Sequence, residues 1–336
     1  MIPGIRLFAT ALVVWALAAA QQPAAQRLLG GRPLLHAHNC YPEKGKWADR
    51  IDRALATGLT PIVIEQDLAL TARDGKPVTV VSHDTELTGT EPTLEEYFFK
   101  RVQPMLERAL AAKTLQQWPL LVLHLDFKTN EPEHHRVVLD LLKRYERFLT
   151  TAPRGDLKSI QPLRMGPLLV LTENGPGQEA AFTDPAHGDR LLLFGSAPAP
   201  AASKIEDAEQ RAHALAAATP EELIGAPASN YRRWVNFSWQ VVESGGQPRA
   251  GAWLAADRQR LKAIVDRGHS LGYLVRFYVL NGHTAAEHPE WTASYNFGSF
   301  DAVKQRWQAA IDAGVDLIAT DHYEELAALL KSSSHR

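Results

Sequence analysis

Apolar runs alternate with amphipathic segments along most of the chain, which predicts strands separated by helices. The runs Leu120–Leu123 and Leu191–Phe194 are continuously apolar, as strands buried in a parallel sheet are. The predicted strands are Leu34–Asn39, Pro61–Leu70, Val78–His83, Leu120–Lys128, Leu168–Thr172, Leu191–Gly195, Val235–Trp239, Leu274–Leu280 and Leu317–Thr320. The predicted helices include Trp47–Thr57, Thr93–Lys113, Glu133–Phe148, Ala255–Arg267 and Phe300–Ala313. Strands that alternate with helices imply a parallel sheet.

One predicted strand exceeds the eight that a closed α/β barrel needs. The segment after the second strand is too short for a crossover helix and contains Asp74-Gly75, which favours a tight hairpin turn. We therefore expect Val78–His83 to fold back antiparallel on the second strand, with Glu65 opposite His83 within one residue of register. The remaining strands predict an α/β fold, a (β/α)8 TIM barrel with an extra antiparallel hairpin strand after strand 2.

Several segments outside these elements have a composition typical of loops. The Pro- and Ala-rich stretch Ser196–Ser203, the short Gly225–Ser229 and the polar stretch Gln178–Asp189 are predicted to be loops. Residues 21–30 and the Ser-rich tail Ser332–Arg336 are predicted to be disordered.

The N-terminus has the pattern of a secretory signal peptide. Arg6 supplies the positive charge, Leu7 to Leu17 form a short apolar region, and Ala18-Ala19-Ala20 offers small residues before a cut at Gln21. The sequence thus predicts a signal peptide over residues 1–20, a linker over 21–33 and one barrel domain over 34–331. We expect an exported protein, secreted or periplasmic; an uncleaved N-terminal anchor is the alternative.

Composition and charge narrow the classes of function. The chain has 336 residues, of which 45% are hydrophobic and 22% charged, as in an ordinary globular protein with a sizeable core. A net charge of −2 gives no global attraction to nucleic acid, while peripheral contact with a membrane surface through a local patch stays open. Cys40 is the single cysteine, so no intramolecular disulfide forms, and a buried bystander thiol is preferred to a nucleophile.

Polar residues that carry chemistry follow the predicted strands. The clusters are His36-Ala37-His38-Asn39, Glu65-Gln66-Asp67, Ser82-His83-Asp84, Asp126-Phe127-Lys128 and Thr320-Asp321. Barrel enzymes keep their active sites at the carboxyl ends of the strands, so we expect these clusters to meet at one mouth. Glu65, Asp67 and Asp126 can offer oxygen ligands to Mg²⁺ or Ca²⁺. The alternative spreads them along the interior, paired with basic residues.

Each remaining candidate has a functional and a structural interpretation. Lys128 binds a phosphate oxygen or pairs with Asp126, and His36 and His83 act as acid, base or nucleophile or support the strand ends. For His38 a metal contact, a phosphate contact and packing are equally open. Asn39 binds phosphate or caps the turn, Trp239 and Arg276 line the pocket wall or the core, and Thr320-Asp321 marks barrel closure.

The order and spacing of these motifs resemble a known superfamily. His36, Glu65-x-Asp67, His83-Asp84, Asp126-x-Lys128 and the segment Ala313–Asp321 are similar to the phosphatidylinositol-specific phospholipase C-like phosphodiesterases, over about residues 34–330. That group includes glycerophosphodiesterases, from whose His-Arg-Gly motif Ala37 departs, and sphingomyelinases D, whose His-x-x-Asn motif is matched. The first motif is most similar to the altered-inheritance-of-mitochondria branch, with Cys40 in place of the usual Asp. The resemblance implies a catalytic pair His36 and His83, metal ligands Glu65, Asp67 and Asp126, and a phosphate contact from Lys128.

The sequence thus favours a secreted, metal-assisted phosphoric diester hydrolase acting on a phospholipid or glycerophosphodiester. Two alternatives stay open. His36-x-His38 also opens the metal site of amidohydrolases and of polymerase-and-histidinol-phosphatase enzymes, in which Asp321 would be a further ligand of Zn²⁺. A non-catalytic binding protein on the same barrel is the other alternative, because a fold alone does not prove activity.

Overall fold

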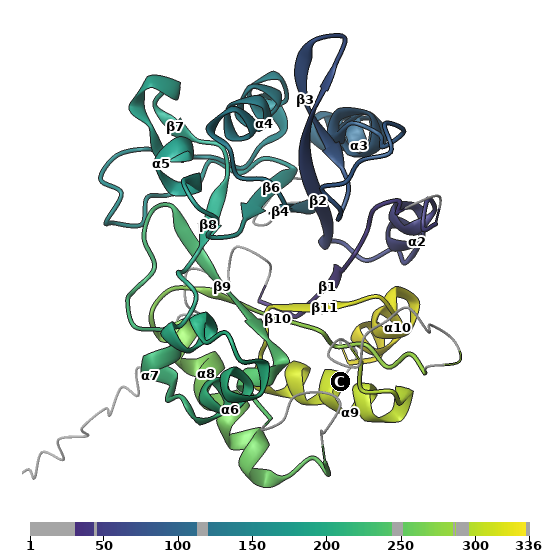
Figure 1. Cartoon of the computed structure of the whole chain (residues 1–336), viewed down its shortest axis with the longest axis vertical. Coiled ribbons are helices and arrows are strands. Elements are labelled where there is room, and N and C mark those ends of the chain that lie inside the picture. Colours follow the sequence, from purple (N-terminus) through teal and green to yellow (C-terminus); the bar gives the residue numbers. More distant parts are fainter. Residues whose placement is uncertain are drawn as a thin grey trace, which may run out of the picture.

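The barrel is formed by eight parallel strands that close on themselves. The computed structural model describes residues 31–43, 46–112, 120–243, 251–284, 286 and 296–333. The strands follow the order β1-β11-β10-β9-β8-β6-β4-β2, and β1 pairs with β2 to complete the ring (Figure 1). Their bounds are β1 Leu34–Ala37, β2 Ile62–Arg73, β4 Leu121–Phe127, β6 Leu168–Thr172, β8 Phe194–Ser196, β9 Arg232–Ser238, β10 Leu274–Tyr278 and β11 Leu317–Thr320. The predicted (β/α)8 fold is confirmed.

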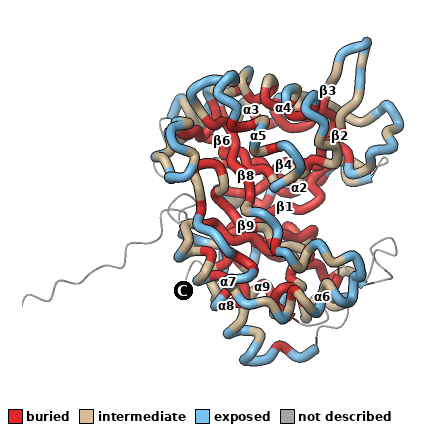
Figure 2. Tube along the Cα trace, turned by 60° about the vertical axis from the view of Figure 1, so that its left-hand side comes forward, coloured by how far each residue is buried: buried red, intermediate tan, exposed pale blue. Residues whose placement is uncertain are grey.

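Helices alternate with the strands and surround the barrel (Figure 1). They are α2 Arg50–Ala56, α3 Lys100–Ala111, α4 Pro132–Arg144, α5 Gln178–Thr183, α6 Ala208–Ala217, α7 Pro220–Leu223, α8 Ala255–Ser270, α9 Phe300–Ala313 and α10 Tyr323–Ser333. Shorter helical segments are Glu95–Phe99, Glu146–Phe148, Pro185–His187, Ala201–Lys204 and Trp239–Val241. Parallel strands need such cover on their outer faces, and the buried residues are concentrated in the barrel and the inward sides of the helices (Figure 2).

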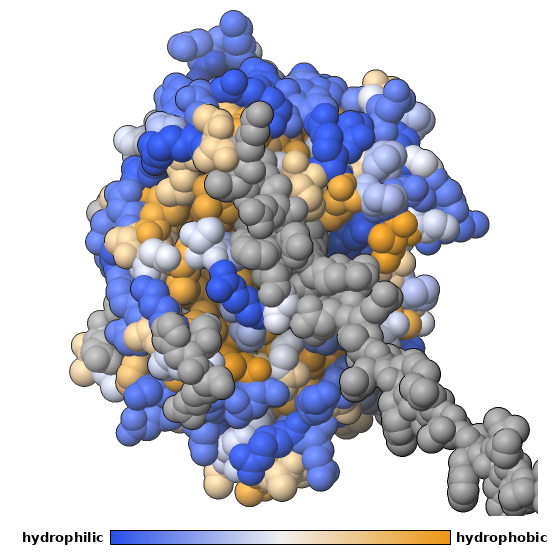
Figure 3. All heavy atoms as spheres, turned by 180° about the vertical axis from the view of Figure 1, so that it is seen from behind, coloured by the Kyte–Doolittle hydropathy of each residue, from blue (hydrophilic) through white to orange (hydrophobic). Residues whose placement is uncertain are grey.

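Hydrophilic side chains predominate around the rim of the molecule in Figure 3, whereas hydrophobic side chains are concentrated in the central part of that face. The core behind this surface is built from the strands. Leu121, Val122 and Leu123 of β4 are all buried, as a strand covered on both sides requires. The apolar run that predicts this strand therefore reflects burial on both faces of the sheet.

The predicted hairpin is present. Strand β3 (Lys76–Val81) pairs antiparallel with β2, from Arg73 opposite Lys76 to Leu68 opposite Val81. Asp74 and Gly75 have φ of 50° and 72°, as both central residues of a tight hairpin turn require. The amide of Ser82 donates to the carbonyl of Asp67 at 2.9 Å, so the register brings the next residue, His83, beside Gln66. This is one residue from the predicted partner Glu65.

Two element predictions are wrong. The apolar run predicted as one strand over Leu191–Gly195 is divided between two sheets. Its start lies in β7 (Arg190–Leu191), which pairs antiparallel with β5 (Ala152–Pro153), and its end lies in the barrel strand β8. The stretch Gln178–Asp189, predicted to be a loop, begins with α5, whose Gln178 and Phe182 are buried. In the first stretch, a uniformly apolar run conceals the point where the chain passes from one sheet to the other. In the second, polar composition conceals a short helix.

The ends of the chain bear on the remaining predictions. The predicted signal peptide, residues 21–30 and the last three residues of the tail lie outside the described part, while Ser332 and Ser333 belong to α10. Within the described residues, none of the helices combines the length and the apolar character needed to cross a bilayer.

Candidate active site

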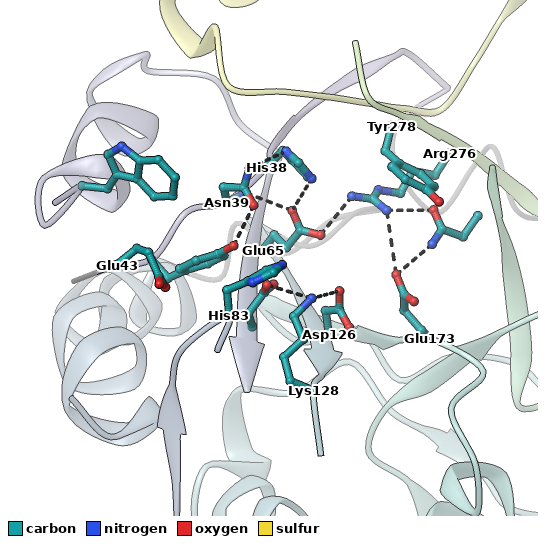
Figure 4. A pocket seen from close by; sticks show the side chains of 14 residues that line it. His38, Asn39, Glu43, Glu65, His83, Asp126, Lys128, Glu173, Arg276 and Tyr278 are labelled. Carbon is teal, nitrogen blue, oxygen red and sulfur yellow. Dashed lines mark hydrogen bonds and ion pairs between the residues drawn. The ribbon is translucent and has the colours of Figure 1, made fainter. Parts of the chain in front are cut away.

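A pocket of about 370 Å³ opens at the carboxyl ends of the barrel strands (Figure 4). It is lined by His38, Asn39, Tyr41, Glu43, Trp47, Glu65, Asp67, His83, Asp126, Lys128, Glu173, Asn236, Arg276 and Tyr278. These residues come from both halves of the chain, and only closure of the barrel brings them together. The convergence of the first four sequence clusters on one mouth is therefore observed.

Three carboxylates form one wall of the pocket. Glu65 and Asp67 project from β2, and Asp67 is the direct neighbour of Asp126 on β4. Oxygen atoms of Glu65, Asp67 and Asp126 lie within 4.8 Å of one another. The ammonium of Lys128 lies between two of them, 2.9 Å from Asp67 and 2.7 Å from Asp126. Lys128 thus contacts two of the three closely spaced carboxylates, Asp67 and Asp126.

The electrostatics of this wall favour a further cation. Burial, together with the charge of Asp126, raises the pKa of Asp67 to about 8. Burial and the charge of Glu173 also raise the pKa of Asp126. Burial alone would lower the pKa of Lys128, but Asp67 and Asp126 raise it. A trio of oxygen donors that resists full ionisation fits a hard divalent ion such as Mg²⁺ or Ca²⁺, which would relieve the repulsion.

A second group with metal-ligand chemistry, His36, Glu65 and His124, lies buried below the pocket. Arg276 already supplies a positive charge there. Its Nε donates to Nδ1 of His36 at 3.0 Å and its Nη2 to Oε1 of Glu65 at 3.0 Å. Burial alone would raise the pKa of Glu65, but His38, Arg276 and His124 hold it well below its usual range. The charge of this group is thus compensated by its neighbours, whereas Asp67 and Asp126 of the carboxylate trio share the ammonium of Lys128.

His38 lines the pocket, and one of its ring nitrogens contacts Asp321. Its Nδ1 lies 3.0 Å from Oδ1 of Asp321, and its Nε2 lies 3.8 Å from Oε2 of Glu65. Burial alone would lower the pKa of His38, but the carboxylates of Glu65 and Asp321 outweigh it and raise the pKa. The carboxylates of Glu65 and Asp321 therefore favour the protonated form of His38 next to the carboxylate wall.

Asn39 supports this arrangement from the following turn. It has φ of 52°, and its amide group donates to Oδ1 of Asp321 at 3.2 Å and its backbone N–H to Oε2 of Glu65 at 3.1 Å. The hydroxyl of Tyr41 donates to its side-chain oxygen at 2.7 Å. Asn is among the few residues that adopt this backbone conformation readily. Its side chain lines the pocket, but its hydrogen bonds hold the turn.

His36 does not line the pocket, contrary to the prediction that it is the first catalytic residue. It is fully buried one layer deeper in the barrel, with Arg276 on one ring nitrogen and His124 on the other at 3.2 Å. Burial and the charge of Arg276 hold its pKa well below the usual range. Residues two apart on a strand share a face, as predicted, but they differ in depth.

This depth also separates the two histidines as metal ligands. His38 belongs to neither group of potential metal ligands found among the described residues. The ring of His36 contacts His124, whereas the ring of His38 contacts Asp321. Both rings approach the same Oε2 of Glu65, His36 at 4.0 Å and His38 at 3.8 Å, but they are not in one ligand group among the described residues.

His83 lies at the rim of the pocket, where the hairpin delivers it. Its side chain is 53% exposed, and its Nδ1 lies 3.6 Å from Oδ1 of Asp84. His38 and His83 lie on different sides of Glu65 (Figure 4). Two histidines thus approach the carboxylate wall from separate strands, one buried and ion-paired and the other accessible to water.

Trp239 is not a pocket residue, contrary to the prediction. Strand β9 ends at Ser238, and Trp239 begins a short helical turn, so it leaves the alternation that would place it inside the barrel. Its indole N–H donates to Oε2 of Glu243 at 2.7 Å, and its ring packs on Trp253 and Phe277. The core interpretation of this residue is the correct one.

The pocket also contains residues that the sequence analysis did not single out. Glu173 follows β6 directly and accepts a hydrogen bond from Asn236 at 2.8 Å, while Asn236 in turn accepts one from Arg276 at 2.7 Å. A carboxylate immediately after an apolar strand is the same signal that identifies Asp126, and it would have identified Glu173. Asp321, treated as a marker of closure, instead contacts His38.

Comparison with known proteins adds distant likenesses only. No protein-family model and no curated protein matches the chain. A solved glycerophosphodiester phosphodiesterase from Parabacteroides distasonis is 15% identical, with a TM-score of 0.46, over 90% of this chain and 98% of that one. Dihydropteroate synthases from Burkholderia cenocepacia (15% identical, TM-score 0.40, 90% and 91% covered) and Thermus thermophilus (18%, 0.38, 90% and 94%) are similar to the same extent. Likenesses at this level of identity concern the fold alone.

Proposed function

We propose that this protein is a metal-dependent phosphoric diester hydrolase. The observation that carries the proposal is the meeting of the Glu65, Asp67 and Asp126 carboxylates with two histidines and a lysine in one pocket. Phosphate is the substrate group that uses all of these side chains. It carries negative charge that a cation must neutralise, and its ester oxygens need a proton when they leave.

The cationic groups account for binding of the phosphate. A divalent ion held by the three carboxylates, Mg²⁺ or Ca²⁺ by their chemistry, would neutralise a phosphate oxygen and make phosphorus more electrophilic. Lys128 is placed beside two of these carboxylates and binds a further phosphate oxygen as a point charge. Arg276 holds Glu65 and Asn236 in place and lines the pocket behind them.

The histidines account for proton transfer. His38 takes the catalytic role expected of His36, because it reaches the pocket and its proton is stabilised by Asp321 and Glu65. It donates this proton from Nε2 to the leaving alkoxide as the P–O bond breaks. His83 acts from the accessible side as the base for the attacking hydroxyl, or attacks phosphorus itself. The attacking hydroxyl belongs to water or to the substrate itself. Attack by a hydroxyl of the substrate would give a cyclic phosphate.

The proposal extends to the finer features of the sequence. By motif resemblance, we propose that the protein is a phospholipase C-like phosphodiesterase of the altered-inheritance-of-mitochondria branch and that its substrate is a phospholipid or glycerophosphodiester. Export, secreted or periplasmic, rests on residues 1–20 alone.

A diester screen tests the proposal. The purified protein is incubated with bis(p-nitrophenyl) phosphate, glycerophosphocholine, lysophospholipids and inositol phospholipids, each with Mg²⁺ or Ca²⁺. We expect hydrolysis of at least one diester, a loss of at least about a hundredfold in His38→Ala and His83→Ala, and little change in His213→Ala, a surface histidine of α6. Equal activity in all four proteins, or no hydrolysis of any diester, would contradict it.

A further inference from the structure

A second cavity adjoins the pocket where β6, β8 and β9 end. Its volume is about 110 Å³, and it shares two lining residues, Glu173 and Asn236, with the main pocket. The two side chains are hydrogen-bonded to each other at 2.8 Å, and Arg276 donates to Asn236 at 2.7 Å. The pair therefore stands between the two cavities, and the smaller one is called the side chamber below.

The lining of the side chamber differs from that of the main pocket. Away from the boundary, Ala197, Pro198, Pro200, Leu223 and Phe237 contribute apolar side chains, and Asn174 and Ser196 contribute uncharged polar ones. Among the described residues that line it, Glu173 is the only charged one. That carboxylate already contacts other groups, because His124 lies 3.6 Å and Arg276 4.0 Å from its Oε1. The chamber thus suits an uncharged, aliphatic group rather than an ion.

The size of the chamber limits that group. A cavity of about 150 Å³ holds one benzene molecule, or roughly 25 Å³ per carbon. By this measure the chamber of about 110 Å³ accommodates about four carbons. A long acyl chain would have to continue into solvent.

We propose that the side chamber binds the short aliphatic part of an alcohol esterified to the phosphate. The inference rests on the proposed function, because the phosphate must first be held at the carboxylate wall and Lys128. From there, one ester arm is directed past Glu173 and Asn236 into the chamber. The chamber would then select substrates by the length of that arm, independently of the groups that perform the reaction.

Calorimetric titration with a series of n-alkyl phosphates from methyl to hexyl, in the presence of Mg²⁺, tests the inference. We expect affinity to rise about fourfold per added methylene up to about four carbons and then to level off. Ala197→Phe should fill the chamber, lowering the affinity for butyl phosphate about tenfold or more while methyl phosphate stays within twofold. The matched control is Ala201→Phe, an exposed position on the same connection that does not line the chamber.

A second variant guards against a folding defect in the first. Leu223→Ala should enlarge the chamber and move the plateau to longer chains. The same dependence on chain length in wild type, Ala197→Phe and Leu223→Ala would overturn the inference while leaving the proposed function intact. Failure of every alkyl phosphate to bind, methyl phosphate included, would overturn both.

Discussion

Asp321 determines how His38 is presented to the pocket. Its carboxylate engages Nδ1 of His38 at 3.0 Å and also accepts from the amide of Asn39. Arg50 lies 3.6 Å from the same oxygen. With Nδ1 occupied, Nε2 is the nitrogen left to exchange a proton with a substrate. Asp321 therefore acts as a positioning residue, through His38 rather than on the phosphate.

Asp321→Asn should slow turnover without weakening binding. The amide keeps the shape of the side chain but removes the charge that raises the pKa of His38, so the proton needed by the leaving group is lost. We expect kcat to fall about 10²- to 10³-fold at neutral pH while KM changes less than about threefold. Steady-state kinetics measure this, with Asp189→Asn at an exposed position as the control. A kcat within twofold of wild type would argue against the role.

His134 should make the fold sensitive to mild acid, away from the pocket. Its ring is buried between the hydroxyls of Thr79 at 3.0 Å and Thr129 at 2.7 Å. Burial lowers its pKa from 6.5 to about 4. Between pH 4 and pH 6.5 the unfolded chain binds this proton more tightly than the folded chain. The contribution of neutral His134 to the free energy of unfolding is therefore complete above pH 6.5 and falls as the pH is lowered towards 4. The loss is on the order of 3 kcal/mol.

Urea unfolding at pH 7 and pH 4.5 checks the contribution of His134. The difference in the free energy of unfolding between the two pH values should shrink in His134→Gln, since glutamine does not titrate. His213→Gln, on the exposed face of α6, should keep the wild-type difference. An unchanged pH dependence in His134→Gln would show that another group is responsible.

At the scale of elements, the β2–β3 hairpin is what brings His83 to the site. Strand β3, which precedes His83, ends at Val81 and is not one of the eight barrel strands. Its pairing with β2 nevertheless places His83 beside the carboxylate wall. The turn depends on Gly75, whose φ is 72°. A Cβ at this position would meet no atom within 4 Å, so backbone strain is the whole cost of a side chain there.

Gly75→Ala should destabilise the hairpin slightly and leave catalysis alone. An L-residue with this φ costs about 1–2 kcal/mol. The pairing of Leu68 with Val81, next to the site, remains. We expect a lower free energy of unfolding in urea with kcat/KM within twofold of wild type. Asp74→Asn, which suits the same turn, should be neutral. Increased stability in Gly75→Ala would contradict the turn geometry.

Some strands and the hairpin turn could be predicted from the sequence because they depend on local pattern. Strands β6 and β11 have their predicted bounds, and Asp74-Gly75 predicted the hairpin and hence the place of His83. How deep a side chain lies in the barrel could not be predicted from the sequence. His36 and His38 share a face, but which of them is covered depends on Arg276 and His124, which come from distant strands. Trp239 was misplaced because its strand ends one residue earlier.

At the scale of the whole molecule, barrel closure creates the site. His38 and Asp321 are 283 residues apart in the chain, and they meet because β1 pairs with β11. The carboxylates come from β2 and β4, and Arg276 comes from β10. Under the proposed function, this assembled wall holds the divalent ion on which diester hydrolysis depends.

The most direct test is the rate of diester hydrolysis as a function of Mg²⁺ concentration after complete chelation, in wild type and Asp126→Asn. The control is Asp140→Asn, on the exposed surface of α4. We predict no turnover in chelated protein, recovery on adding the metal, and an apparent metal constant at least about tenfold weaker in Asp126→Asn than in wild type or Asp140→Asn. Full turnover in chelator, or the same metal dependence in all three proteins, would contradict the account.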